Sequence, residues 1–194
     1  MVPRSQPDLL QRECNGRNFP SRSTLIITNP ALEAIGHVDI VKRCIPPETP
    51  VRVTIIPDAE PDIKIVKQGV EALNFYKADQ IIALGGGSVI DAAKITKLQY
   101  EFPDADLEEL AAPFLDIRKR VVQYPTEKTN HARLIAVSTT SGTGSEVTPF
   151  AVMTDKERGF KGHAGRLFAN AGRRDCRSAV CDVDAEGPDG RYRC

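Results

Sequence analysis

The chain has 194 residues, with 26 Lys and Arg against 26 Asp and Glu, and 41% of its residues are hydrophobic. This length suffices for one ordinary domain, the zero net charge excludes the basic surface of a nucleic-acid-binding protein, and the apolar content excludes disorder along the whole chain. Because no stretch approaches the roughly 18–20 apolar residues of a membrane span, and because the start of the chain lacks the apolar segment of a secretory signal, we expect a cytoplasmic protein without membrane contact.

Predicted strands and helices alternate along most of the chain. Residues 1–23 show no sustained periodicity and contain several prolines, so we expect an irregular lead-in. After it, short β-branched or apolar runs predict strands, and apolar residues at helical spacing between them predict helices. The expected strands are residues 24–28, 51–56, 80–84, 133–137 and 147–154, and the expected helices follow Pro30, Asp62 and Ser88, with two short ones at 107–112 and 116–122. This alternation is typical of a doubly wound parallel α/β sheet.

A glycine-rich turn, Gly85-Gly86-Gly87-Ser88, follows the third expected strand. Residues without a Cβ let an anion approach the backbone, and the start of the next helix offers unpaired N–H groups and the positive end of the helix dipole. The turn therefore predicts a phosphate site, although its spacing differs from the G-x-G-x-x-G pattern. The structural alternative is a tight turn in which Ser88 is the N-cap of the helix and Asp91 completes a capping box.

A second polar loop, residues 138–145, follows the fourth expected strand and combines Ser and Thr hydroxyls with two glycines. Such hydroxyls can hydrogen-bond the ribose or pyrophosphate oxygens of a nucleotide. Either loop alone is equally compatible with a structural turn. Two of them at the ends of buried strands favour a dinucleotide site, because ligands of open α/β sheets bind at the carboxyl ends of the strands.

Metal and nucleophilic chemistry find little support in the residues. The three histidines form no H-x-x-x-H pair, and we expect His37 and His131 to lie at the surface or in turns. His163 with Cys176, Cys181 and Cys194 fits no known zinc-finger spacing. We therefore expect neither a catalytic residue nor a metal ligand in this chain.

Two long motifs, residues 81–94 (IIALGGGSVIDAAK) and 135–155 (IAVSTTSGTGSEVTPFAVMTD), resemble the iron-containing alcohol dehydrogenase family. Residues 107–111 and 114–120 are similar to the alcohol dehydrogenase half of the bifunctional acetaldehyde-CoA/alcohol dehydrogenases. The resemblance implies a Rossmann-like doubly wound parallel sheet of the dehydroquinate synthase-like fold, here incomplete and without the helical metal-binding domain. It covers residues 24–161, which would form the NAD(P)-binding domain.

The resemblance also implies a function: an NAD(P)-dependent oxidoreductase that interconverts primary alcohols and aldehydes by hydride transfer, with iron or zinc in intact members. Their dinucleotide and small alcohol or aldehyde would be the partners, with no nucleic acid, and intact relatives could form homo-oligomers. Asn29 stands where the family usually has an Asp that accepts from the adenosine ribose, so the choice between NAD and NADP is open. The implied cofactor-binding residues are Asn29, Gly86, Gly87, Ser88, Asp91, Thr139, Thr140, Thr143, Val152 and Lys161.

Residues 162–194 differ from the rest of the chain in composition. All ten Lys lie at or before Lys161, whereas six of the 16 Arg and three of the five Cys lie after it. We expect a disordered, non-family tail that arose by a reading-frame shift near residues 160–162, because permitted codons for residues 170–191, read one base later, can spell strings similar to the family's continuation. Coding DNA without such a second frame would contradict this hypothesis.

The family's metal ligands, one Asp and three His, have no counterparts here, so we expect weak nucleotide binding at best and no dehydrogenase turnover. An alternative from another class is a non-catalytic nucleotide-binding or interaction module in which the tail contacts a partner. A third is a sugar-phosphate lyase of the dehydroquinate synthase type, which shares the fold.

Overall fold

The computed structural model describes residues 21–57, 61–105, 131–148, 151–155, 160–164 and 176–180. Within these stretches strands and helices follow one another largely as the hydrophobic pattern predicts. In chain order they are β1 (Thr24–Thr28), α2 (Pro30–Ala34), α3 (His37–Arg43), β2 (Val51–Ile55), α4 (Ile63–Tyr76), β3 (Gln80–Gly85), α5 (Gly87–Glu101), β4 (Arg133–Ser138), β5 (Ala151–Asp155), β6 (Phe160–Ala164) and β7 (Cys176–Val180). The short helices expected at 107–112 and 116–122, and most of the lead-in, lie outside the described residues.

Five strands form one sheet in the order β2-β1-β3-β4-β7, and all four of its pairings are parallel. From β1 the chain first moves outward to β2 and then returns to β3 on the other side of β1, so the strand order reverses between β1 and β3. This confirms the expected α/β class with a doubly wound parallel sheet. In such sheets the crevice at the point of reversal is where ligands bind.

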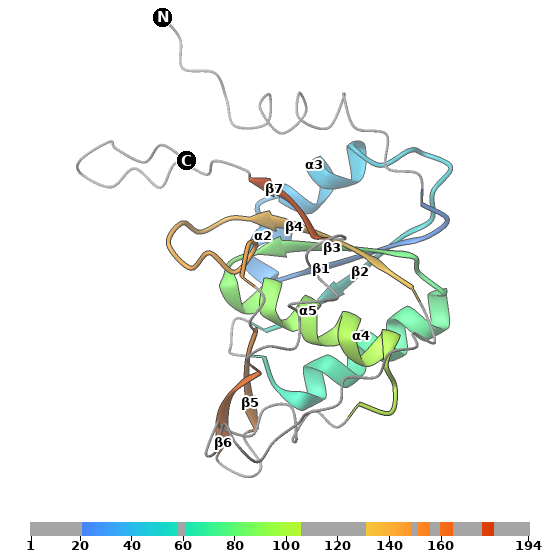
Figure 1. The fold of residues 1–194 in the computed structure, drawn as a ribbon. Helices are drawn as coiled ribbons and strands as arrows, with labels where there is room; N and C mark the ends of the chain where they lie inside the picture. Colours follow the sequence, from blue (N-terminus) through green and yellow to red (C-terminus); the bar gives the residue numbers. More distant parts are fainter. Residues whose placement is uncertain are drawn as a thin grey trace, which may run out of the picture.

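The two faces of the sheet are covered by different helices (Figure 1). Alternate strand residues belong to two separate apolar clusters, as a side-chain period of two requires. Ile26, Ile82 and Ile135 pack with residues of α2 and α3, whereas Leu25, Ile81 and Leu134 pack with residues of α4 and α5. The strands β1, β3 and β4 are thus buried on both faces, which explains their nearly continuous apolar runs.

After β1 the structure has two short helices where the hydrophobic periodicity predicts one. The single helical pattern expected after Pro30 is two short helices, because Gly36 between them adopts φ +82°. A left-handed residue ends one helix and redirects the chain into the next. Among the described helices none is both long and apolar enough to cross a bilayer.

The expected fifth strand is present but does not join the parallel sheet. It begins at Ala151, later than the expected 147–154, and pairs antiparallel with β6, with Met153 opposite Gly162. The strand predicted at 147–154 is thus confirmed in part, and it lies outside the parallel sheet. Alternating apolar residues predict a strand but carry no information about which strand it pairs with.

Two strands fall partly or wholly within residues 162–194, for which we expect disorder. β6 extends to Ala164, and β7 occupies the position next to β4, with Leu134 opposite Cys176 and Ser138 opposite Val180. The unpaired N–H and C=O groups at the edge of β4 can accept a strand of almost any composition, because the ladder is made of backbone hydrogen bonds. The rest of this segment lies outside the described residues.

Candidate functional site

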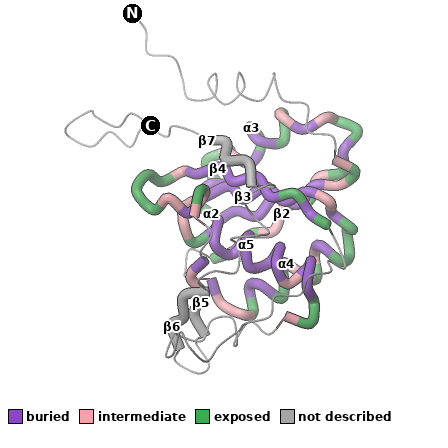
Figure 2. The backbone as a smooth tube through the Cα atoms, in the orientation of Figure 1, coloured by how far each residue is buried: buried purple, intermediate pink, exposed green. Residues whose placement is uncertain are grey.

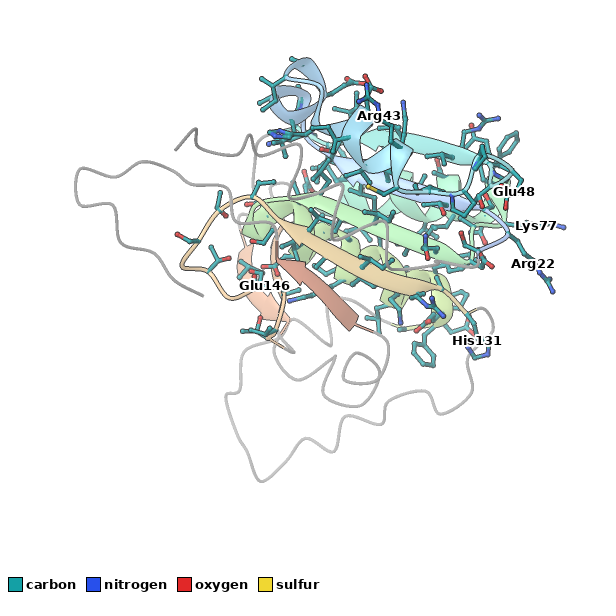
Figure 3. The ribbon with its side chains drawn as sticks, turned by 90° about the horizontal axis from the view of Figure 1, so that it is seen from above. Arg22, Arg43, Glu48, Lys77, His131 and Glu146 are labelled. Carbon is teal, nitrogen blue, oxygen red and sulfur yellow. The ribbon has the colours of Figure 1, made fainter. Side chains whose placement is uncertain are left out.

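Three polar segments meet at the carboxyl ends of β1, β3 and β4. Asn29 follows β1, Gly86 follows β3 and Thr139 follows β4. Gly85 lies opposite Ser138 in the sheet, and the N–H of Thr139 donates to the carbonyl of Gly85 at 3.1 Å. Figure 3 shows Glu146 of the loop after β4 at this end, with Arg22, Lys77 and His131 at the opposite end of the strands. The two loops singled out from the sequence therefore lie together.

The glycine-rich turn leads directly into the N-terminus of α5. The N-cap is Gly86, not Ser88, and no side chain caps this helix. The alternative of a capping box formed by Ser88 and Asp91 is therefore wrong: Asp91 is buried, and Ser88 is exposed within the first turn. The first N–H groups of a helix have no partner within it, so an uncapped N-terminus of a 15-residue helix favours an anion.

The Ser/Thr loop packs so closely on the turn that side chains there are excluded. A Cβ on Gly86 would lie 3.0 Å from Oγ1 of Thr140, and a Cβ on Gly87 would lie 3.1 Å from Oγ of Ser145 and 3.2 Å from Cγ2 of Thr143. A side chain at either glycine would therefore force the hydroxyl-bearing residues of the loop to shift. Hydroxyl groups stand beside unpaired amides, which is an arrangement suited to phosphate and sugar oxygens.

Asp91 connects the first turns of α5 to both following segments. Its Oδ2 accepts from the N–H of Val152 at 3.0 Å, and its Oδ1 lies 3.4 Å from Nζ of Lys94, which also lies 3.4 Å from Oγ1 of Thr148. Burial raises the pKa of the Asp91 carboxyl, although the Val152 amide, the Lys94 charge and a hydrogen bond with Ser145 act to lower it. The carboxylate is therefore a buried anchor of the loop and of β5.

Asn29 lies at the site, and its side chain also stabilises the start of α2. Its Oδ1 accepts from the N–H of Leu32 at 3.0 Å and so caps α2. The adjacent Thr28 is fully buried, and its Oγ1 makes no hydrogen bond. At the end of β1 the chain therefore has a neutral amide whose oxygen caps α2, in place of a carboxylate.

The remaining expected residues lie on the β5–β6 pair. Val152 is half-buried at the start of β5, and Lys161 lies in β6 opposite Thr154. His131 precedes β4 at the far end of the sheet and does not contribute. In the part of the chain that the structure describes, no three His, Cys, Asp or Glu residues are grouped so that they could hold a metal ion.

Sequence reasoning overlooked two contributors, Lys94 and Thr148. Both contact the cluster around Asp91, yet neither has a distinctive residue type. One feature of the sequence could have indicated the pair. Asp91 and Lys94 are three residues apart, and polar residues do not gather on one side of this helix, so both charges were candidates for burial as a pair.

Comparisons with known proteins match this chain to alcohol dehydrogenases. The sequence model of the iron-containing alcohol dehydrogenases matches residues 10–171, a range that extends beyond both ends of 24–161. The chain is 47% identical over 143 residues to the bifunctional aldehyde-alcohol dehydrogenase AdhE of Escherichia coli, covering 72% of this chain and 16% of that protein. It is 34% identical over 142 residues to an NADPH-dependent butanol dehydrogenase of Clostridium saccharobutylicum, again covering 72% of this chain and 34% of that enzyme.

A solved structure gives the same result. The iron-containing alcohol dehydrogenase of Thermococcus thioreducens superposes with a TM-score of 0.62 at 29% identity, covering 82% of this chain and 39% of that one. The chain thus spans well under half the length of each of these relatives.

Proposed function

Because the chain belongs to the iron-containing alcohol dehydrogenase family, we propose that it is the cofactor-binding part of an NAD(P)-dependent alcohol dehydrogenase. The observation that carries this proposal is the contact between the glycine-rich turn and the Ser/Thr loop at the uncapped N-terminus of α5. The substrates of the whole enzyme would be primary alcohols and aldehydes.

Each segment of the site has a distinct task in holding the dinucleotide. The amides of Gly87 and Ser88, at the positive end of the α5 dipole, would bind the pyrophosphate, and the exposed Ser88 hydroxyl would add a donor. Thr139, Thr140 and Thr143 would bind ribose and phosphate oxygens. Asp91, Val152 and Lys161 would form the nicotinamide side of the site. Bound NAD(P) supplies the carbon that accepts or releases the hydride, and the protein orients it.

The described residues do not fit the family's iron, since no ligand group is present among them. We expect the 194-residue chain to bind NAD(P) weakly and to form no NADH from ethanol.

Calorimetry of the purified chain with NAD tests the proposal. We expect binding in the wild type and at least a tenfold weaker affinity in Gly87→Val, because a branched side chain would occupy the space between the turn and the loop. The exposed Lys67 on α4 provides the control, and Lys67→Ala should bind like the wild type. Absence of any heat with NAD and NADP, together with capture of a partner that depends on residues 162–194, would favour the non-catalytic interaction module instead.

The same titration addresses the choice between NAD and NADP. Asn29 places a neutral amide instead of a carboxylate at the end of β1, so its side chain does not repel a 2′-phosphate. The NADPH-dependent relative supports NADP as a cofactor of this family. We expect affinities for NAD and NADP within about tenfold, and Asn29→Asp should shift the preference toward NAD, because a carboxylate repels the phosphate.

A further inference from the structure

The feature that the proposed function leaves unexplained is Lys94, a lysine buried inside α5. Only 4% of its side chain is exposed, although lysine is rarely buried unless it is paired. We propose that Lys94 is a positioning residue: its ammonium group holds the Ser/Thr loop and the start of β5 against the first turns of α5, and so shapes the site. The expected effect of Lys94 on nucleotide binding rests on the proposed function, whereas its role in holding the loop and the start of β5 does not.

Lys94 contacts the loop directly and is linked to β5 through Asp91. Its Nζ lies 3.4 Å from Oδ1 of Asp91 and 3.4 Å from Oγ1 of Thr148, which is the last described residue of the loop. Through the other oxygen of Asp91 the link continues to the N–H of Val152 at 3.0 Å. The cation thus binds Thr148 before residues 149–150, and the carboxylate with which it pairs binds Val152 after them.

The charges around this link make the cation necessary. Asp91 is 7% exposed, and an ionised carboxylate at such a depth needs compensation. α5 offers Lys94, the loop offers the Ser145 hydroxyl and carries Glu146 beside it, and β5 offers the backbone amide of Val152. Among the charged groups that are described as contacting Asp91, Lys94 is the one cation.

The second buried lysine of the same helix serves as a natural comparison. Nζ of Lys97 lies 2.9 Å from Oε2 of Glu101, whose Oε1 accepts from the N–H of Ala132 at 3.2 Å. This pair joins the C-terminal end of α5 to the residue before β4 and lies away from the loop. Lys97→Met therefore removes a buried paired charge, as Lys94→Met does. It should affect the contact with the residue before β4 and not the loop or β5.

Hydrogen exchange of the full chain, resolved at single amides by NMR, tests the proposal. In Lys94→Met we expect exchange at Val152 to accelerate at least tenfold relative to the core amides of β3, with at least tenfold weaker NAD binding. Lys97→Met should leave the ratio of Val152 to β3 exchange unchanged, even where it destabilises the whole domain. An unchanged ratio in Lys94→Met would overturn the proposal.

The pH profile separates a charge role from simple packing. The measured quantity is the exchange rate of the Val152 amide in Lys94→Met divided by the rate in the wild type at the same pH. This ratio should grow as the pH rises, because Asp91 then ionises without its cation. In an Asp91→Asn background the same ratio should not vary with pH. A ratio that is flat with pH in both backgrounds would mean that Lys94 only fills space, which contradicts the proposal.

A milder variant covers the case in which Lys94→Met does not fold. Thr148→Val removes the hydroxyl that Lys94 contacts and keeps the shape of a half-buried side chain. We expect about threefold faster exchange at loop amides up to residue 148, and wild-type rates there would overturn the proposal. If the wild type fails to bind NAD while the exchange results hold, the proposed function fails and the positioning role of Lys94 stands.

Discussion

The two ends of α5 both bury a lysine paired with an acid, but their surroundings differ. The side chains of both pairs are buried, but Lys94 contacts the loop after β4, which is largely exposed (Figure 2), whereas the partner of Lys97, Glu101, binds the buried residue before β4. The first pair connects to segments that a ligand would touch, and the second to the start of a central strand. Similar chemistry thus lies beside the proposed site at one end of the helix and beside a central strand at the other.

The largest effect is expected at the interior end. Glu101→Gln keeps an oxygen for the Ala132 amide but leaves the Lys97 charge buried without compensation. We expect a loss of about 3–5 kcal/mol in the free energy of unfolding, measured with urea. A loss below 1 kcal/mol would mean that the Lys97 charge does not depend on Glu101 for compensation, and the contrast between the two ends would weaken.

A smaller loss is expected where β3 turns into α5. A Cβ on Gly85 would lie 2.5 Å from Cγ2 and 2.6 Å from Cβ of Val89, so Gly85→Ala forces the turn and the helix apart. We expect about 1–3 kcal/mol of destabilisation in thermal or urea unfolding. The double variant Gly85→Ala/Val89→Gly should show a smaller loss than the sum of the losses of the two single variants, because the clashing side chain at position 89 is then absent. Additive losses would mean that the strain does not come from contact with Val89.

A pH-dependent difference is expected from Asp91. Because burial raises its pKa in the folded chain above the unfolded value, its contribution to stability is complete at acid pH and is lost as the pH rises through the folded pKa. Asp91→Asn removes this titration. The difference in unfolding free energy between the variant and the wild type should therefore shift in favour of the variant from pH 4 upward, and a difference independent of pH would contradict the assignment.

The smallest effect is expected for an exposed pair of the same type. Lys42 and Asp39 on α3 lie 3.6 Å apart, with 44% and 70% of their side chains exposed. Asp39→Ala should change the unfolding free energy by no more than about 0.5 kcal/mol, because water screens such pairs. A loss comparable to that of Glu101→Gln would show that burial is not what distinguishes the interior pair.

Local sequence patterns predicted the central strands and the two polar loops well. β1 matches its expected range, and β2, β3 and β4 end within one residue of theirs. Their apolar runs reflect burial on both faces, which needs no knowledge of neighbours. The pairing of β5 with β6, the break at Gly36 and the strand β7 were not predictable in the same way, because each depends on backbone partners distant in the sequence or on a single left-handed residue.

The amino-acid sequence by itself determined the parallel α/β class, the glycine-rich turn and the Ser/Thr loop, since these follow from hydrophobic period and residue type. Only the tertiary structure decided that Gly86 caps α5, that Ser88 is free of that task, and that Asp91 and Lys94 join α5 to the loop and to β5. A residue type specifies which hydrogen bonds a side chain can make. Which of them it makes depends on the groups that folding brings within reach and shields from water.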